Sequence, residues 1–160
     1  MMERPLRGRW ALILGASSGF GAAAGKALAA EGMNIAGVHL DLRATLLQAR
    51  EVIASIEAQG VKALFFNTNA ADPDRRRKVL DGLAEEIGPG ETVHVLMHSL
   101  AFGTLKPFIP PSREDGSPGA AEDAIEPAQM DMTLNVMAHS LVYWTQDMVA
   151  RGLLGRGSRI

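Results

Sequence analysis

The sequence predicts an α/β fold, in which a parallel β-sheet carries helices on both faces. Short, uninterrupted apolar runs alternate along the chain with longer amphipathic stretches, and glycine or proline separates most of them. Parallel strands are buried on both faces and read as continuous apolar runs, and right-handed helical crossovers connect them. The length of 160 residues suits one domain of this kind.

The first half of the chain supplies two strands and two helices. Trp10–Leu14 is the first apolar run, and a glycine-rich turn over residues 15–21 follows it directly. The alanine-rich residues 22–30 form the first predicted helix. Ile35–Leu40 is the second predicted strand, and the amphipathic helix after it ends near Gly60, a residue typical of helix C-termini.

The next crossover leads to the fourth strand. Val61–Phe66 is the third apolar run, and Asp72-Pro73 then supplies an N-cap and a first-turn proline for another helix. The basic cluster Arg75–Lys78 on the first turns of that helix is interpreted as a solvated face. Val93–Met97 is the fourth predicted strand.

The last third of the chain has a different character. Residues 103–126 contain four prolines and three glycines, which predicts a surface loop or a lid over a site. Residues 127–151 read as one long helix that is apolar on more than one face. Because one sheet face cannot cover this much apolar surface, we expect a homo-oligomer through this helix, with Met137, Trp144 and Met148 as candidates for the exposed stripe. Ser158 begins a fifth apparent strand.

Composition excludes several classes of function. The net charge of −2 gives no overall attraction to nucleic acid or to an anionic membrane surface. The chain has no cysteine and no apolar run of the length that spans a bilayer, which fits a cytoplasmic protein. We expect no metal site, because His94 and His98 have helical ligand spacing but fall on or after a strand.

The glycine-rich turn carries the main functional signal. It follows a strand and opens a helix, the context in which glycines let the backbone approach a pyrophosphate. Asp41 lies about 20 residues further on, after the second strand, where an acid can hold a ribose 2′-hydroxyl. The sequence therefore predicts dinucleotide binding at the carboxyl ends of strands one, two and four, in a sheet of order 3-2-1-4. The turn residues expected to bind are Gly15, Ser17, Ser18, Gly19, Phe20 and Gly21.

The spacing Gly-x3-Gly-x-Gly resembles the short-chain dehydrogenase/reductase family, whose members have a three-layer Rossmann-like fold. Asn69-Ala70-Ala71-Asp72 resembles the family's Asp-Val-x-Asp motif, with Asn69 in place of the adenine-binding acid. His98-Ser99-Leu100-Ala101 stands where most members have Asn-Asn-Ala-Gly, and this stretch is similar to the enoyl-acyl-carrier-protein reductase branch. The resemblance adds to the cofactor-binding set Asn69, Ala70, Ser99, Leu100 and Ala101.

The resemblance implies NAD(P)-dependent oxidoreduction of a small-molecule carbonyl or enoyl substrate, with an acyl thioester as the leading candidate. Asn135 matches the family's catalytic asparagine, which favours the carbonyl reductases over the enoyl branch. The choice between NAD and NADP stays open. The usual acid position falls nearer His39 than Asp41, and Arg43 is close enough to meet a 2′-phosphate.

One departure from the family concerns catalysis. The family's serine, tyrosine and lysine are all expected beyond Ile160. Tyr143 is interpreted as a packing residue, because Asp147 stands where a lysine would follow a catalytic tyrosine. Two hypotheses remain. Residues 1–160 are a dinucleotide-binding domain, truncated at the start of strand five and inactive alone, or they are a non-catalytic nucleotide-binding module or subunit that needs a second chain for the tyrosine and lysine.

Overall fold

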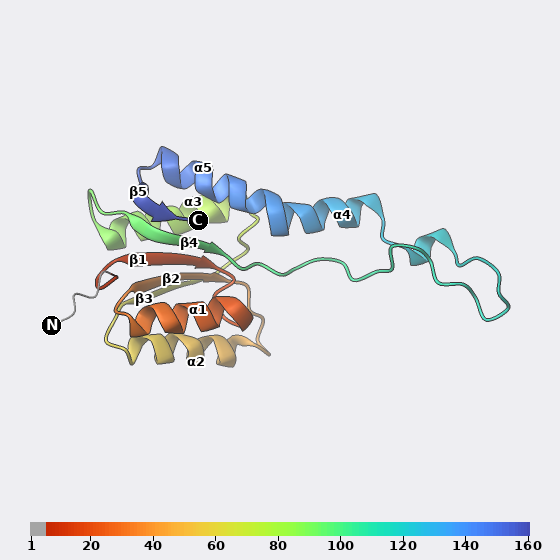
Figure 1. Ribbon diagram of the computed structural model, residues 1–160, viewed down its shortest axis with the longest axis horizontal. Helices are drawn as coiled ribbons and strands as arrows, with labels where there is room; N and C mark the ends of the chain where they lie inside the picture. Colours follow the sequence, from red (N-terminus) through yellow and green to blue (C-terminus); the bar gives the residue numbers. More distant parts are fainter. Residues whose placement is uncertain (1–5) are drawn as a thin grey trace.

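The computed structural model describes residues 6–160 and contains one five-stranded parallel sheet, of order β3-β2-β1-β4-β5 (Figure 1). The predicted α/β class and the order 3-2-1-4 are confirmed, and a fifth strand extends the sheet beside β4. The strands are β1 (Trp10–Leu14), β2 (Asn34–His39), β3 (Ala63–Asn67), β4 (Val93–His98) and β5 (Leu154–Arg159). Strand β5 therefore begins four residues before the predicted start at Ser158.

Helices cover both faces of the sheet (Figure 1). On one face lie α1 (Gly19–Ala30) and α2 (Leu46–Glu57), and on the other lie α3 (Pro73–Ile87) and α5 (Ser140–Ala150). Side chains of β1 alternate between the two layers: Leu12 and Leu14 pack with α3 and α5, whereas Ile13 packs with α1 and α2. All three are fully buried, as expected of a central parallel strand.

The predicted helix over residues 127–151 is continuous but not uniform. It consists of α4 (Pro127–Leu134), a π-helical segment η2 (Asn135–His139) and α5. The prediction that Trp144 and Met148 belong to an exposed stripe is wrong, since both are fully buried against the sheet. The Trp144 indole N–H also donates to the Ala70 carbonyl at 2.9 Å, which fixes the ring inside the domain.

Helix α4 behaves differently from α5. It buries none of its residues and extends past the carboxyl edge of the sheet (Figure 1). Met137, in the following π segment, is 45% exposed, so this part of the predicted stripe is confirmed as exposed. Among residues 6–160, no helix combines the length and apolarity needed to cross a membrane.

Residues 103–126 form a long arm that starts at the carboxyl edge of the sheet and runs outward before returning to α4 (Figure 1). The two sides of the arm are joined by a backbone hydrogen bond from Ile125 to the Pro107 carbonyl at 2.9 Å. One short 3₁₀ turn, η1 (Ala121–Asp123), interrupts it. The prediction of a surface loop is confirmed, and the arm extends away from the domain rather than folding back over the sheet as a lid.

Candidate functional site

The glycine turn lies where the carboxyl ends of three strands meet. The Gly15 amide donates to the Val38 carbonyl of β2 at 2.8 Å, and the Ser99 amide after β4 donates to the Leu14 carbonyl at 2.7 Å. Gly15 has a φ of +88°, and a Cβ there would lie 2.4 Å from the Ser99 oxygen. Only glycine allows this approach, so the turn is held against both neighbouring strands.

The other two glycines of the turn have different surroundings. A Cβ on Gly21 would lie 1.9 Å from the Gly15 carbonyl oxygen, so Gly21 lets α1 begin directly against the turn. Gly19 has a φ of +53°, and a Cβ there would meet nothing within 4 Å. Gly15 and Gly21 are therefore required by packing, whereas a side chain at Gly19 would face open space.

The N-terminus of α1 is open to an anion. Its N-cap residue Ser18 makes no side-chain capping bond, and the first turn carries no acidic residue. The first amides of a helix have no intrahelical partner and lie at the positive end of the helix dipole. Ser18, Gly19 and Phe20 are all exposed. The helix N-terminus thus offers unpaired amides and a positive dipole end, and the space beside Gly19 is open. A pyrophosphate needs both features, so these residues fit a dinucleotide.

The acid of the site is Asp41. Its Oδ2 lies 2.7 Å from the Nδ1 of buried His39, and the side chains of Ser17 and Thr45 are near enough to its carboxylate to lower its pKa. Burial raises the pKa of Asp41, but the hydrogen bonds from Ser17, Thr45 and His39 outweigh it and hold the pKa below its ordinary value of 3.8. The structure thus brings both sequence candidates, His39 and Asp41, into one cluster that includes the glycine turn through Ser17.

Arg43, the alternative partner for a nucleotide phosphate, has an exposed side chain that bonds to no other residue within 6–160.

Asn67, at the end of β3, is a positioning residue that the sequence analysis missed. Its side chain accepts from the Asp41 amide at 2.9 Å and donates to the Asp41 carbonyl at 3.0 Å. The sequence does place an amide side chain directly after an apolar strand. Because an amide can donate and accept at once, such a residue can hold the backbone of a neighbouring loop.

Asn69 and Ala70 follow β3 and lead into α3. The Asn69 side-chain oxygen accepts from the Ala71 amide at 2.9 Å, which leaves its NH₂ group for other partners. Ala70 is buried, and its carbonyl is engaged by Trp144. Of this pair, only the exposed Asn69 presents a side chain on the surface.

The remaining predicted residues follow β4 or lie on the helix beside it. Ser99 and Leu100 are half-buried, and Ala101 is exposed. Asn135 is the first residue of the π segment; its side chain is exposed and bonds to no other residue in the described part of the chain. The structure brings Ser99 against Gly15, whereas the Asn135 side chain forms no hydrogen bond with another predicted residue within 6–160.

Tyr143 lies on α5, which covers the opposite face of the sheet from α1. The Arg76 guanidinium carbon lies 5.6 Å from the centre of its ring, and His139 lies beside it with ring centres 6.5 Å apart. These contacts agree with its interpretation as a packing residue.

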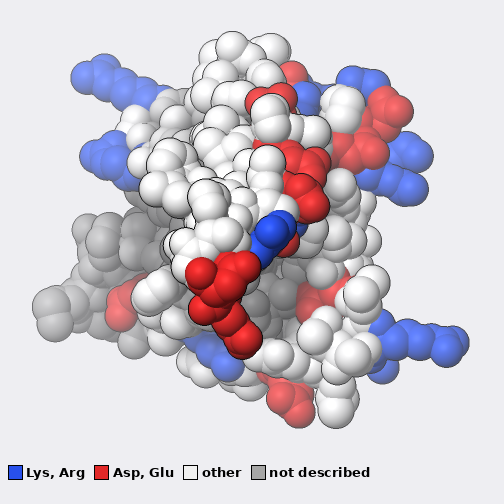
Figure 2. Space-filling model, turned by 90° about the vertical axis from the view of Figure 1, so that its right-hand side faces the viewer, with Lys and Arg blue, Asp and Glu red and all other residues white. Residues whose placement is uncertain are grey.

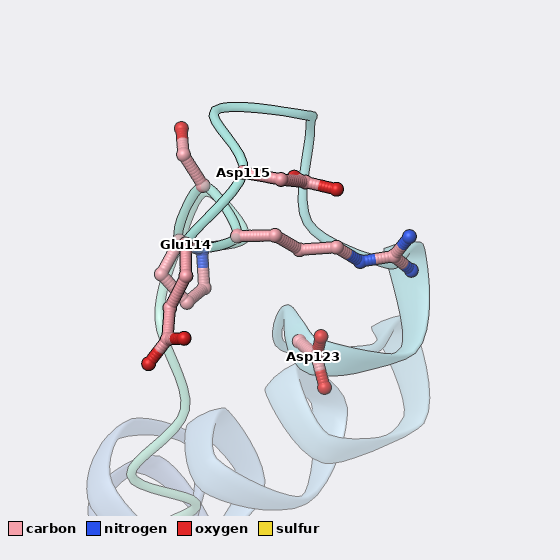
Figure 3. A pocket seen from close by; sticks show the side chains of 6 residues that line it. Glu114, Asp115 and Asp123 are labelled. Atoms are coloured by element: carbon pink, nitrogen blue, oxygen red, sulfur yellow. The ribbon is translucent and has the colours of Figure 1, made fainter.

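The tip of the arm holds a separate open hollow. It is lined by Pro111, Ser112, Arg113, Glu114, Asp115 and Asp123. Figure 2 faces this end of the molecule and shows acidic side chains gathered over it. In Figure 3 the carboxylates of Glu114, Asp115 and Asp123 point in different directions rather than toward one point. Across residues 6–160, no group of three His, Cys, Asp or Glu side chains is placed to hold a metal ion.

Comparison with known proteins decides the family. The sequence profile described as short chain dehydrogenase matches residues 9–158. The chain belongs to the short chain dehydrogenase family. This is a family of oxidoreductases, and the match covers β1 to β4, most of β5, the glycine turn and Asn135.

Similar proteins include L-2,3-butanediol dehydrogenase of Corynebacterium glutamicum, which is 31% identical over 105 residues, 66% of this chain and 39% of the relative. A solved Burkholderia cenocepacia short chain dehydrogenase in complex with NADP is 31% identical, with a TM-score of 0.69 over 97% of this chain and 54% of that one. A Serratia marcescens short-chain dehydrogenase/reductase variant is 25% identical, with a TM-score of 0.74 over 98% and 55% of the two chains. The chain therefore spans about half the length of the two solved structures and 39% of L-2,3-butanediol dehydrogenase.

Proposed function

We propose that residues 1–160 form the dinucleotide-binding part of a cytoplasmic NAD(P)-dependent oxidoreductase that acts on a carbonyl or enoyl substrate, such as an acyl thioester. The observation that carries the proposal is the glycine turn, in which two glycines are required by packing and Gly19 faces open space at an uncapped helix N-terminus. Family membership and the NADP-bound relative support it.

Different residues of this chain would bind different parts of the dinucleotide. The first amides of α1 would bind the pyrophosphate, and Asp41 would accept a hydrogen bond from the adenosine ribose. The free NH₂ of Asn69 would face the adenine, and Ser99, Leu100 and Ala101 would line the nicotinamide side. A bound nicotinamide supplies hydride transfer to or from the substrate. Asn135 would hold a water in the path of the accompanying proton.

The charge around Asp41 favours NAD over NADP. Its lowered pKa keeps the carboxylate ionised at neutral pH, and an ionised acid attracts a ribose hydroxyl but repels a 2′-phosphate. Calorimetric titration of the chain with NAD⁺ and with NADP⁺ tests this choice. We expect tighter binding of NAD⁺, and a smaller difference in Asp41→Asn. Tighter binding of NADP⁺ by the unaltered chain would assign the nucleotide phosphate to Arg43 instead.

We further propose that residues 1–160 alone bind the dinucleotide but do not turn over substrate. Asn135 is the one residue among them that matches the family's catalytic set in the sequence analysis, and Tyr143 is engaged with Arg76 rather than with the glycine turn. NADH and NADPH oxidation with acetoacetyl and crotonyl thioesters is the assay. Turnover above background would contradict this and would make Tyr143→Phe the next variant to assay.

A further inference from the structure

The π segment at Asn135–His139 lies between α4 and α5 and contains the predicted catalytic asparagine as its first residue. A π turn holds one more residue than an α turn, so its i→i+5 bonds shift the following helix by one position. In an α-helix one position corresponds to a rotation of about 100°. The direction of the Asn135 side chain relative to α5 and the sheet therefore depends on the π turn being kept.

A short hydrogen-bond chain holds this turn from the side. The Ser140 hydroxyl donates to the Val136 carbonyl at 2.6 Å, and its oxygen lies 2.8 Å from the His98 Nε2. Because the single hydroxyl proton of Ser140 is used by Val136, Nε2 of His98 must be the donor to Ser140. Ser140 is buried, and burial also lowers the pKa of His98, which keeps the imidazole neutral at pH 7.

A second contact joins the stretch after β4 to α4, on the N-terminal side of Asn135. The Thr104 amide donates to the Thr133 hydroxyl at 3.2 Å, and a Cβ on Gly103 would lie 2.6 Å from the Thr133 side chain. The stretch from His98 to Thr104 is therefore fixed at Ser140 and at Thr133, and Asn135 lies between these two points along the helix. This stretch also contains Ser99, whose backbone contacts Gly15 of the glycine turn.

We propose that His98 is a positioning residue: through Ser140 it maintains the π turn and so fixes the direction of Asn135 relative to the nucleotide site. The functional meaning of this role rests on the proposed oxidoreductase function, whereas the structural link can be tested without nucleotide. His98 touches neither the nucleotide nor the substrate in this proposal. The role requires only that the His98 N–H donates a hydrogen bond, and it involves no proton transfer.

Two pairs of variants separate the hydrogen bond from the bulk of the side chain. His98→Leu and Ser140→Ala remove the donor or the hydroxyl, whereas His98→Gln and Ser140→Thr keep an N–H or a hydroxyl at similar reach. Hydrogen–deuterium exchange of the 160-residue chain without nucleotide is the first measurement. We expect at least about a fivefold faster exchange of the amides in residues 135–141 for the first pair, near-normal exchange for the second pair, and unchanged exchange in α1.

The side-chain amide NMR signal of Asn135 is the second measurement. It should shift in His98→Leu and return toward its original position in His98→Gln. Equal exchange over residues 135–141 in all variants would overturn the proposal. So would a uniform rise in exchange that includes α1, since this would show general destabilisation. Dinucleotide titration of the unaltered chain tests the proposed function independently, so the two can fail separately.

Discussion

Arg76 of α3 donates from its Nε to Oδ2 of Asp147 on α5 at 2.6 Å, and this ion pair joins the two helices that cover one face of the sheet. The interpretation of Arg75–Lys78 as a solvated face is wrong for Arg76, which is only 8% exposed. Its guanidinium also lies over the Tyr143 ring. Asp147 thus has a structural role at the position where a lysine would follow a catalytic tyrosine.

Loss of this ion pair should weaken the packing of α5. We expect Arg76→Met to lower the free energy of unfolding by about 1–3 kcal/mol, because Asp147 would keep a partly buried charge without its partner. Urea denaturation measures the change. Arg77→Met is the matched control, since Arg77 pairs with Asp74 on the exposed side of α3 and should cost below about 1 kcal/mol. Equal losses in both variants would contradict the structural role of Arg76.

The glycines of the turn should separate folding from binding. In Gly21→Ala the new Cβ overlaps the Gly15 carbonyl, so we expect a loss of at least about 2 kcal/mol in unfolding free energy. Gly19→Ala should keep the fold but weaken dinucleotide binding at least about tenfold, or 1.4 kcal/mol, by calorimetry. Gly60→Ala is the control, since Gly60 also has a positive φ with no neighbour for a Cβ but lies at the C-terminal end of α2. An equal change in affinity for Gly60→Ala would contradict the assignment of the pyrophosphate to Gly19.

Asp41 should make stability depend on acid pH. Its pKa in the folded chain is below the ordinary value of 3.8, so its contribution is fully present above that value and is lost as the pH falls through the folded pKa. Asp41→Asn should therefore flatten the pH dependence of the urea midpoint below about pH 4, where the unaltered chain loses this contribution. Asp123→Asn, on the arm, serves as the control variant. An unchanged pH dependence in Asp41→Asn would show that its hydrogen bonds do not favour the ionised form.

The exposed face of α4 and the π segment is the corrected candidate for an oligomer interface. Met130, Leu134 and Met137 are spaced to share one stripe, and all three are exposed. We expect the chain to be oligomeric by size exclusion with light scattering, and Leu134→Glu with Met137→Glu to produce smaller species. Leu47→Glu, on an exposed position of α2, should leave the mass unchanged. A monomeric unaltered chain would refute the prediction.

The sequence predicted the sheet order and the glycine turn because both depend on local patterns: apolar runs, helix stops and a strand–glycine–helix junction. It could not predict contacts that join distant segments. Trp144 was assigned to the surface because periodicity shows which residues share a stripe, not which stripe faces the sheet. The π segment was missed because Asn135–His139 has ordinary helix-forming composition, and the contact of Ser140 with His98 joins residues far apart in the chain.

The alternation of side chains along β1 divides the interior into two compartments with only the sheet backbone between them. Leu12 and Leu14 share neighbours with Leu80 and Trp144, whereas Ile13 shares them with Ile56 and Met33. Substitutions in different compartments therefore have few common contacts and should combine additively, even when the altered residues are adjacent in the chain. Substitutions within one compartment, such as Leu12 with Trp144, should show energetic coupling. Sequence changes in such a domain could thus accumulate on one side of the sheet without compensation on the other.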